Sequence, residues 1–541
     1  MRLSHNSRDD CTHQSHERNA VNRGGQRIAN CLSAAKLLHE HGVELVVLEA
    51  SDRVGGRTLT QTPSEKAGDP HYGWVDLGAS YVGPTQNHVL RLCRELGCET
   101  YLCRDNHDSI YFSKGKRCRY SNSWPTFWWS SPLAAWDLHA TIRKLDNMAL
   151  QVPADYPWQA PHAVQWDNIT VKEFLKKHCW TRDAREFLEG MAVANNTAED
   201  HEMSLLFFLW YLHQAQGVNH IWQAKGGAQE RKIIGGSQQL SIKMAKNLGD
   251  RIHLKKVVVQ IRHMNDGVVV KTLDGTVFNG SHVIMAIPPL AHLKIHFDPP
   301  LPSLRHGLIQ RCPMGIVLKC TVFYKREFWV EKGYNGFVSC MDGIEVVGDV
   351  HEDQKPGISL YGLICFIFGQ HAIQLKDMEQ SARRDAICRS LANFYDSQEA
   401  LESVYYVDKL WLEEPYIGGC YSSYCSPGVL TRFGPAIREP IGKRIYLAGT
   451  ETALEWTGYM NGAIEAGERA AREVLHAQGK ISRRDIWVKE PEFSGVSVKP
   501  LQPSWMETCQ PNFETILTVS ALIVGLLVAL FEWIQSTIYS R

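Results

Sequence analysis

The sequence has no excess of charge of either sign: 58 Lys and Arg balance 58 Asp and Glu over 541 residues. Proteins that bind nucleic acid through phosphates usually carry a basic surface, so we expect no nucleic-acid partner. The 15 cysteines form no CxxC pair with zinc-ligand spacing, and we predict no metal site. Cysteines scattered in this way are typical of reduced thiols in a protein that faces the cytosol.

Long apolar runs are scarce. The first 25 residues contain none, so we expect no secretory signal there. The one long run covers residues 516–534, with Glu532 as its only charge. As a helix it would extend about 28 Å, close to the hydrocarbon thickness of a bilayer. We therefore predict a transmembrane anchor over residues 514–536 rather than a core helix, whereas LLFFLW at 205–210 is too short to span and is predicted to be core.

Short apolar runs predict a fold of the α/β class with α+β features. VELVVLEA at residues 43–50 follows a helical segment and Gly42, which is typical of a helix end and then a strand buried on both faces. Similar strands are predicted at 282–289 and 444–452, the last leading into a helix that ends at Gly479. Because these elements are far apart in the sequence, we expect a discontinuous, Rossmann-like nucleotide-binding domain with a second domain inserted into it.

We place the predicted domain boundaries where the sequence pattern changes. The nucleotide-binding domain is assigned to residues 32–100, 234–308 and 414–479. The inserted domain, expected to bind substrate, is assigned to the Trp-rich segment 101–233 and the strand-patterned segment 309–413. The remaining segments are an atypical N-terminus, residues 1–31, and a connector to the anchor, residues 480–513.

Two features after the first predicted strand indicate a cofactor. Glu49 ends the strand, where an acidic residue of a dinucleotide fold binds ribose hydroxyls. The glycine-rich turn DRVGGRT, which contains Arg57, can approach a pyrophosphate or a flavin edge. Together they resemble the flavin-dependent amine oxidases, which bind FAD. The resemblance to the flavin-containing monoamine oxidases runs from about residue 32 to 487 and includes DLGASYVGPTQN, GGAQERKIIGGS and GGCYSSY.

The segment YIGGCYSSY raises the question of what Cys420 does between two glycines and a tyrosine. The residues alone also allow a buried cysteine in a tight turn. The resemblance implies that the Cys420 thioether joins the 8α-methyl group of FAD, a link that polyamine and L-amino-acid oxidases lack. Cys425 has no such role in the family and is expected to contribute packing only.

The resemblance also implies which residues act on the substrate. Tyr421 and Tyr459 match the two tyrosines that flank the flavin and orient an amine between electron-rich rings. Lys319, inside the apolar strand GIVLKCTVFY, matches the lysine that holds a water at flavin N5. The alternatives are two core tyrosines and an edge lysine that extends to solvent.

Further residues are assigned by the resemblance alone. The implied cofactor contacts, besides Cys420, are Glu49, Arg57, Ala79, Ser80, Val258, Trp411, Thr450, Glu451 and Met460. The implied walls of the substrate pocket are Tyr81, Ala194, Asn195, Ile221, Trp222 and Gln229. Trp222 stands where the family has a smaller residue, which predicts a restricted cavity.

The N-terminus departs from the family, which has a strand and then GxGxxG at a helix start. The three glycine positions fall on Gln26, Ile28 and Cys31, and nothing before them reads as a buried strand. The sheet would then lack its central strand. FAD would lack the glycine-rich turn that is its best phosphate contact. Either residues 1–31 are an alternative start to an ordinary enzyme, which the abrupt resemblance from Leu32 favours, or the chain binds no flavin.

The function implied by the resemblance is oxidative deamination of primary, and some secondary and tertiary, amines to aldehydes, with O2 reduced to H2O2. The alternatives are a flavin-free binding protein on the membrane and a related polyamine or amino-acid oxidase. No arginine clearly supplies the clamp that an amino-acid carboxylate needs. The mitochondrial outer membrane, with the bulk of the chain in the cytosol, and a homodimer are likewise implied, although the tail also fits the endoplasmic reticulum.

Overall fold

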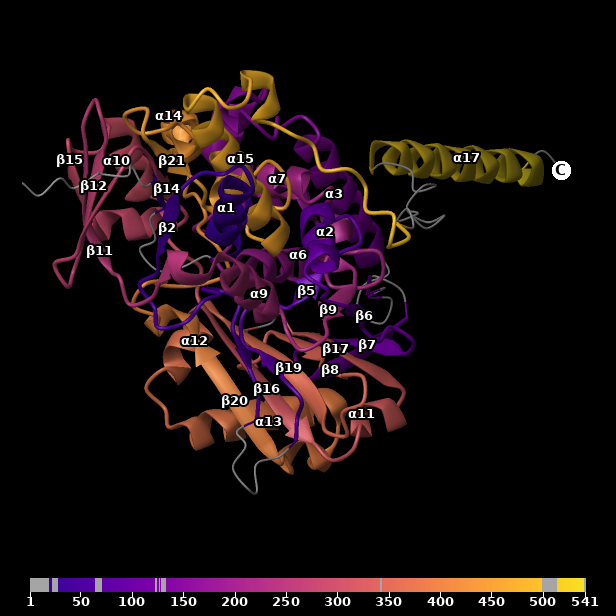
Figure 1. The fold of residues 1–541 in the computed structure, drawn as a ribbon. Coiled ribbons are helices and arrows are strands. Elements are labelled where there is room, and N and C mark those ends of the chain that lie inside the picture. Colours follow the sequence, from indigo (N-terminus) through magenta and orange to yellow (C-terminus); the bar gives the residue numbers. More distant parts are fainter. Residues whose placement is uncertain are drawn as a thin grey trace, which may run out of the picture.

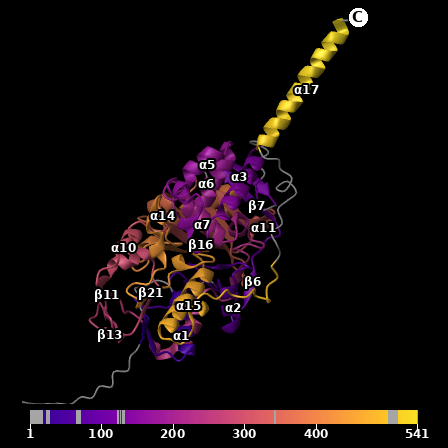
Figure 2. The same cartoon turned by 90° about the horizontal axis from the view of Figure 1, so that it is seen from above.

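The computed structural model describes residues 19–21, 28–63, 71–121, 124–125, 127, 133–340, 343–498 and 513–539. In Figure 1 they form a mixed α/β body, with a parallel sheet in its upper half and a larger, mostly antiparallel sheet below. The C-terminal helix α17 (Phe513–Tyr539) projects away from this body, as Figure 2 shows from above. The predicted fold class is confirmed.

A five-stranded parallel sheet organises the upper half, in the order β10-β2-β1-β14-β21. Its strands come from distant parts of the sequence: β10 Ile252–His253, β2 Leu45–Leu48, β1 Asn19–Val21, β14 Val283–Met285 and β21 Ile445–Leu447. The described side chains of β2, β14 and β21 are buried, as expected for parallel strands covered on both faces. The discontinuous arrangement follows the prediction from the three apolar runs.

The prediction that no strand precedes residue 32 is wrong. Asn19–Val21 form β1, which pairs in parallel with β2 and with β14 and so takes the central place in the sheet. Three residues within a polar stretch carry no hydrophobic periodicity, so the pattern gave no signal for this strand. The glycine positions still differ from GxGxxG, because Ile28 and Cys31 lie in helix α1 (Ile28–Glu40), while Gln26 falls outside the described residues.

Two helices cover this sheet together. Helix α1 packs on α15 (Met460–Ala477), and Leu32 and Ala35 share a buried core with Ile464 and Ala471. The predicted glycine ends of both helices are confirmed, because Gly42 and Gly479 have φ values of +67° and +70°. Such values favour glycine, which has no Cβ to clash with the backbone.

A seven-stranded sheet forms the lower half, in the order β20-β16-β19-β18-β17-β7-β8. Its strands are β20 Tyr405–Leu410, β16 Val317–Tyr324, β19 Tyr361–Phe368, β18 Asp349–Glu352, β17 Tyr334–Cys340, β7 Asp108–Ser113 and β8 Lys116–Tyr120. Only the β17–β7 pair is parallel. Helix α13 (Gln380–Tyr395) covers one face with Ile387 and Leu391 in the core, which leaves the other face for the site described below.

A helical layer packs beside this sheet, built from α3 Ala134–Ala149, α5 Val171–His178, α6 Arg182–Asn196, α7 Leu205–Gln214 and α8 Val218–Trp222. All of α7 except His213 is buried, which confirms that LLFFLW is core. The smaller sheets contain β11 Val258–His263, β12 Val268–Thr272, β13 Val277–Gly280 and β15 His296–Asp298; β5 Tyr81–Val82, β9 Arg231–Ile233 and β6 Thr100–Leu102; and β3 Thr60–Gln61 with β4 Val75–Asp76. The other helices are α2 Asn87–Glu95, α4 Ala163–Asp167, α9 Gln238–Leu248, α10 Ser303–Ile309, α11 Phe328–Glu331, α12 Gly369–Leu375 and α14 Val429–Phe433.

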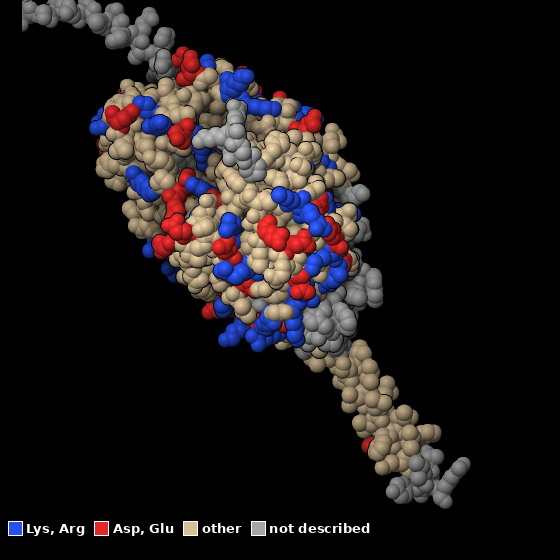
Figure 3. All heavy atoms as spheres, turned by 90° about the horizontal axis from the view of Figure 1, so that it is seen from below, with Lys and Arg blue, Asp and Glu red and all other residues tan. Residues whose placement is uncertain are grey.

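Helix α17 is long and apolar enough to cross a membrane. Its segment Leu517–Gln535 has 19 residues, a mean hydropathy of 2.3 and no residue buried against the body. In Figure 3 it emerges as a rod almost without charged side chains. The alternative of a core helix is therefore wrong, because a core helix would be covered by the rest of the fold.

Deleting residues 513–541 should release the protein from membranes without unfolding it. No residue of Leu517–Gln535 is buried against the body, so we expect the melting temperature of the body to stay the same. The measurement is the distribution between pellet and supernatant after an alkaline carbonate wash of membranes. If the shortened chain stays in the pellet, a second attachment holds it there.

Candidate functional site

Most of the predicted site residues line one cavity of about 1320 Å³. Its lining includes Lys319, Tyr421 and Tyr459 from the predicted substrate-handling group. From the predicted cofactor group it includes Arg57, Ala79, Ser80, Trp411, Cys420 and Met460. All six predicted pocket residues also line it, namely Tyr81, Ala194, Asn195, Ile221, Trp222 and Gln229. Segments far apart in the sequence thus meet around one space.

The loop that carries Cys420 is held by its backbone. Gly419 has φ of +140°, and a Cβ there would lie 2.4 Å from the carbonyl oxygen of Gly315. The Cys420 N–H donates to that oxygen at 2.9 Å, and the Tyr421 N–H donates to Thr197 Oγ1 at 2.8 Å. The Cys420–Tyr421 peptide bond is cis. The close approach of Gly419 to the Gly315 carbonyl needs glycine, and it sets the Cys420 thiol on the cavity wall.

The Cys420 thiol is neutral at physiological pH. Burial raises its pKa to about 12, and the opposing charge of Arg57 does not offset this. Arg57 itself donates to the carbonyl oxygen of Tyr421. The thiol is thus protected from ionisation while it faces the space where a cofactor would lie.

Lys319 is buried on an inner strand of the lower sheet. It lies in β16, which pairs with β19 and β20, so the alternative of an edge lysine reaching solvent is wrong. Its Nζ donates to the carbonyl oxygen of Gly78 at 2.7 Å and to Ser80 Oγ at 2.6 Å, and it lies 5.4 Å from the ring centre of Phe366. Burial lowers its pKa to about 8, although Asp76 acts in the opposite direction. The amine can therefore change its charge near neutral pH.

Tyr421 and Tyr459 present neutral rings to the cavity, because burial raises the pKa of both, that of Tyr459 to about 12. The Tyr459 hydroxyl is 2.8 Å from that of Tyr211. The Tyr421 ring meets Phe366 edge to face, with centres 6.2 Å apart. These contacts fix two electron-rich surfaces beside the space.

Four predicted cofactor residues are not part of the described cavity lining: Glu49, Val258, Thr450 and Glu451. Glu49 follows β2 and accepts from the Ser51 N–H at 2.8 Å, and Val258 is buried at the start of β11. Thr450 and Glu451 follow β21, and Thr450 Oγ1 accepts from the Gly458 N–H at 3.0 Å. They lie around the carboxyl ends of the parallel strands, where open α/β sheets bind ligands.

The residues around Arg57 and Cys420 fit an anionic or carbonyl-bearing cofactor. Arg57 is buried, and its Nη2 has no hydrogen-bond partner among the described residues. The nearest acid is Glu451, whose Oε1 is 3.6 Å from Nη2. A buried guanidinium with a free donor needs an acceptor, which a phosphate or a flavin carbonyl supplies. The first turn of α1 fits less well, because Ile28 and Cys31 stand at glycine positions.

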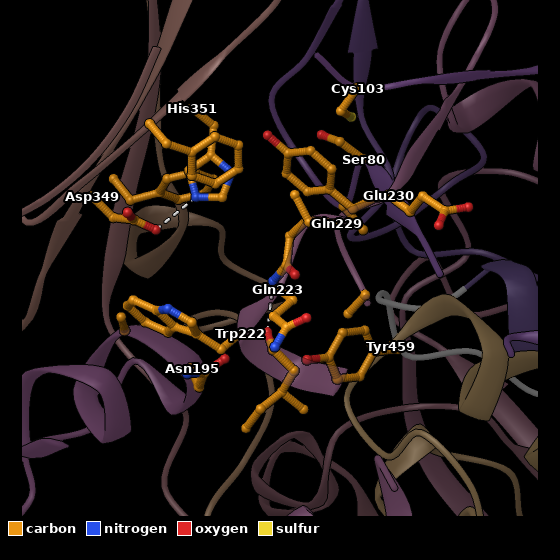
Figure 4. Close-up of a pocket in the computed structure, with 18 of the residues that line it drawn as sticks. Ser80, Cys103, Asn195, Trp222, Gln223, Gln229, Glu230, Asp349, His351 and Tyr459 are labelled. Carbon is orange, nitrogen blue, oxygen red and sulfur yellow. Dashed lines mark hydrogen bonds and ion pairs between the residues drawn. The ribbon is translucent and has the colours of Figure 1, made fainter. Parts of the chain in front are cut away.

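The substrate side of the cavity is an aromatic wall with polar groups, shown in Figure 4. Trp222 stacks on Trp124, with ring centres 5.8 Å apart and planes at 9°. Gln229 Nε2 donates to the Ile221 carbonyl at 2.9 Å. The Tyr81 hydroxyl is buried without a partner in the described part of the chain. Stacking and a hydrogen bond hold parts of this wall in place, and its free polar atoms suit a polar ligand.

Sequence reasoning missed an acid and an imidazole in the same wall. Asp349 and His351 both line the cavity, and His351 Nε2 lies 2.7 Å from Asp349 Oδ2. The available signal was spacing: residues two apart in the strand at GDVHED lie on one face. The segment is short and surrounded by loops, so the alternation did not stand out.

A second group of potential ligands lies outside the described lining of this cavity. The ligand atoms of His88, Glu468 and Glu490 lie within 4.8 Å of one another. Arg91 already binds both carboxylates, with Nε 2.8 Å from Glu490 Oε1. The guanidinium thus pairs with both carboxylates and ties α2 to α15.

Comparison with known proteins places this geometry in context. The family described as flavin containing amine oxidoreductase matches residues 32–475. Flavin-containing amine oxidase A of Bos taurus is 44% identical over 510 residues, which cover 94% of this chain and 95% of that relative. Flavin-containing amine oxidase B of Bos taurus is 44% identical over 492 residues, which cover 91% of this chain and 93% of that relative.

Solved structures show the same similarity. Cyclohexylamine oxidase from Brevibacterium oxydans IH-35A superposes with a TM-score of 0.80 at 30% identity, covering 86% of this chain and all of that chain, 100%. Wild-type putrescine oxidase bound to putrescine superposes with a TM-score of 0.78 at 28% identity, covering 85% of this chain and 99% of that chain.

Replacing Lys319 with methionine should change how stability depends on pH. Below pH 8 the folded protein carries a buried charge, and a pKa lowered from 10.5 to about 8 corresponds to a cost of about 3 kcal/mol. As pH rises from 8 toward 10.5 this cost falls, because only the unfolded lysine still binds the proton. We therefore expect the wild-type melting temperature to rise relative to that of Lys319→Met between pH 7 and 9. A difference that stays constant would contradict the lowered pKa.

Proposed function

The chain belongs to the flavin containing amine oxidoreductase family, and on that premise we propose that it is a monoamine oxidase with covalently bound FAD. Each turnover converts an amine, O2 and water into an aldehyde, ammonia or a smaller amine, and H2O2. The observation that carries the proposal is that one cavity brings together Cys420, Lys319, Tyr421 and Tyr459. The 44% identity to flavin-containing amine oxidases A and B supports the same reaction.

The residues that would hold FAD form two groups, one for the flavin half and one for the nucleotide half of the cofactor. When bound, FAD takes the two electrons of the amine's α C–H bond and passes them to O2. Cys420 would tether it, with the flavin half surrounded by Arg57, Ala79, Ser80, Trp411 and Met460. The nucleotide half would lie along the carboxyl ends of the parallel strands, near Glu49, Val258, Thr450 and Glu451. In this proposal residues 32–100, 234–308 and 414–479, joined by β1, bind FAD, and residues 101–233 and 309–413 bind the substrate.

Tyr421 and Tyr459 would orient the amine between their rings. Raised pKa values keep both hydroxyls protonated, so the rings stay neutral and electron-rich. The hydrogen bond between the hydroxyls of Tyr459 and Tyr211 limits rotation of one ring. A ring held in this way attracts the partial positive charge around an amine nitrogen and points its lone pair toward the reacting centre.

Lys319 would hold a water beside the reacting atoms. An ammonium group has three N–H donors, and two of those on Nζ go to Gly78 and Ser80. The third is left for a water in the cavity. With a pKa of about 8, Lys319 can give up a proton near neutral pH, which suits a step that carries protons between water and product.

An amino-acid oxidase and a flavin-free relative are less well supported. An amino-acid oxidase needs an arginine that is free to bind a carboxylate. Of the two arginines of the described lining, Arg231 is paired with Glu230, whose Oε1 lies 3.1 Å from Nε, and the free Nη2 of Arg57 is assigned to the cofactor in this proposal. A flavin-free relative would have no use for the unpartnered Nη2 of Arg57.

Helix α17 would anchor the enzyme in a membrane, which we propose is the mitochondrial outer membrane with the body on the cytosolic side. The helix passes the length and composition required for one span. Cys312 and Cys425 are both buried thiols, and their sulfurs lie 3.5 Å apart without a disulfide. Free thiols this close suit a reducing compartment. A homodimer is part of the same proposal.

The covalent flavin can be tested directly. We expect purified protein, run on a denaturing gel and soaked in acid, to show a fluorescent flavin band, and the protein to release H2O2 from benzylamine. Cys420→Ala should lose the band, because no thioether can form. Cys425→Ala is the matched control, since it removes a buried thiol five residues away and should keep the band.

A further variant tests whether the missing GxGxxG at the start of α1 prevents FAD binding. If the wild-type chain shows neither a band nor peroxide, the proposed function is wrong for this chain as it stands. Introducing Gln26→Gly, Ile28→Gly and Cys31→Gly then asks whether the first turn of α1 prevents binding. A band that returns would locate the defect there, and continued absence would favour the flavin-free relative.

A further inference from the structure

Four side chains in register cross the sheet face that borders the cavity. Strand pairing sets Lys319 opposite Phe366, Phe366 opposite Asp349, and Asp349 opposite Ser339. Residues directly opposite one another project from the same face, and all four line the cavity. Neighbouring strands are about 4.8 Å apart, so Asp349 lies roughly 10 Å along the row from Lys319.

Asp349 presents a carboxylate to the cavity at this distance, and His351 lies beside it. Their side chains are 16% and 7% exposed, and Figure 4 shows the pair facing the cavity from the side opposite Tyr459. His351 Nε2 lies 2.7 Å from Asp349 Oδ2, so the ring holds the carboxylate in place, and the other ring nitrogen is Nδ1. Nδ1 is buried and has no hydrogen-bond partner among the described residues. The partly exposed carboxylate of Asp349 is therefore the group of this pair that a ligand in the cavity can reach.

The charge of Asp349 also reaches the side chains around the amine position. Burial is the main reason that the pKa of Tyr421 is raised, and Asp349 raises it further. The same two causes raise the pKa of Tyr120, another lining residue. Asp349 thus makes this part of the cavity favourable for a cation.

The other acids of the described lining already have basic neighbours. Glu230 is paired with Arg231, and the charge of Lys225 acts on Asp105. Within the described part of the chain, the ion-pair partner of Asp349 is His351. No lysine or arginine of the described residues forms an ion pair with this carboxylate, in contrast to Glu230.

We propose that Asp349, oriented by His351, selects amine substrates that carry a second positively charged group at the end remote from the oxidised nitrogen. Asp349 is the specificity-determining residue, and His351 is a positioning residue. The inference rests on the proposed amine oxidation. It adds that the preferred substrates include diamines, with one nitrogen between Tyr421 and Tyr459 and the other at Asp349.

The spacing between Lys319 and Asp349 across the sheet sets the length of such a substrate. One nitrogen must reach the tyrosines near Lys319 while the other reaches Asp349, two strands and roughly 10 Å along the sheet. The aromatic wall formed by Trp222 and Trp124 favours an apolar spacer between the two charges. We therefore expect a para-substituted aromatic diamine to fit better than a short one such as 1,2-diaminoethane.

The test compares two substrates that differ only in the remote group, benzylamine and 4-(aminomethyl)benzylamine. We expect wild-type kcat/KM to favour the diamine, and Asp349→Asn to lower the diamine-to-monoamine ratio by about tenfold to a hundredfold, as loss of a charged hydrogen bond implies. The matched control is Asp105→Asn, which makes the same change at another acid of this cavity and should leave the ratio unchanged. Tyramine, with a hydroxyl at the remote end, separates charge recognition from simple hydrogen bonding.

A binding measurement keeps the inference separate from the reaction. Amines with two methyl groups on each α carbon have no α C–H bond to oxidise, so 2-phenylpropan-2-amine and its para diamine can bind without turnover. We expect the diamine to raise the wild-type melting temperature more than the monoamine does, and Asp349→Asn to remove the difference.

The outcomes distinguish the two proposals. Selective binding without peroxide release would retain the diamine site and reject amine oxidation. Peroxide release with equal preference for both substrates, in wild type and in Asp349→Asn, would overturn the diamine site and leave the proposed function intact. A preference for tyramine equal to that for the diamine would also overturn it, because the site would then read a hydroxyl and not a charge.

Discussion

The geometry of the cavity depends on a close contact between two stretches of backbone. A Cβ on Gly419 would lie 2.4 Å from the Gly315 carbonyl oxygen, and a Cβ on Gly315 would lie 2.6 Å from the Cys420 carbonyl oxygen. Gly315 stands four residues before Lys319, so the contact fixes the thiol and the amine relative to each other. A side chain at either glycine would push the Cys420 loop off the wall. Two residues without side chains thus decide where the reactive groups of two distant segments meet.

The elements that could be predicted from the sequence are those with a strong local signal. The apolar runs at 43–50 and 282–289, the glycine ends of α1 and α15, and the apolar C-terminal helix all appear as expected. β1 could not be predicted, because Asn19–Val21 belong to the sheet only through pairing with β2 and β14. Its strand character comes from tertiary structure and not from its composition.

Most of the candidate site was foreseen through resemblance, and the rest depends on strand register. Resemblance named Cys420, Lys319 and the tyrosines, and the structure gathers them at one cavity, although their roles stay predictions. Asp349 belongs to the cavity wall because β18 lies between β19 and β17 in the sheet. Register is a non-local property, so a polar residue in a four-residue strand cannot be assigned to a wall from its neighbours in sequence.

The cysteines have a consequence for an enzyme that releases hydrogen peroxide beside its own thiols. Peroxide oxidises thiolates far faster than thiols, so exposure and pKa decide which cysteines survive. Among the described cysteines only Cys103 is not fully buried; it lines the cavity, and burial raises its pKa to about 11. The same burial raises the pKa of Cys93 to about 12. Burial in this fold therefore keeps Cys103 and Cys93 protonated at neutral pH, which slows their oxidation by peroxide.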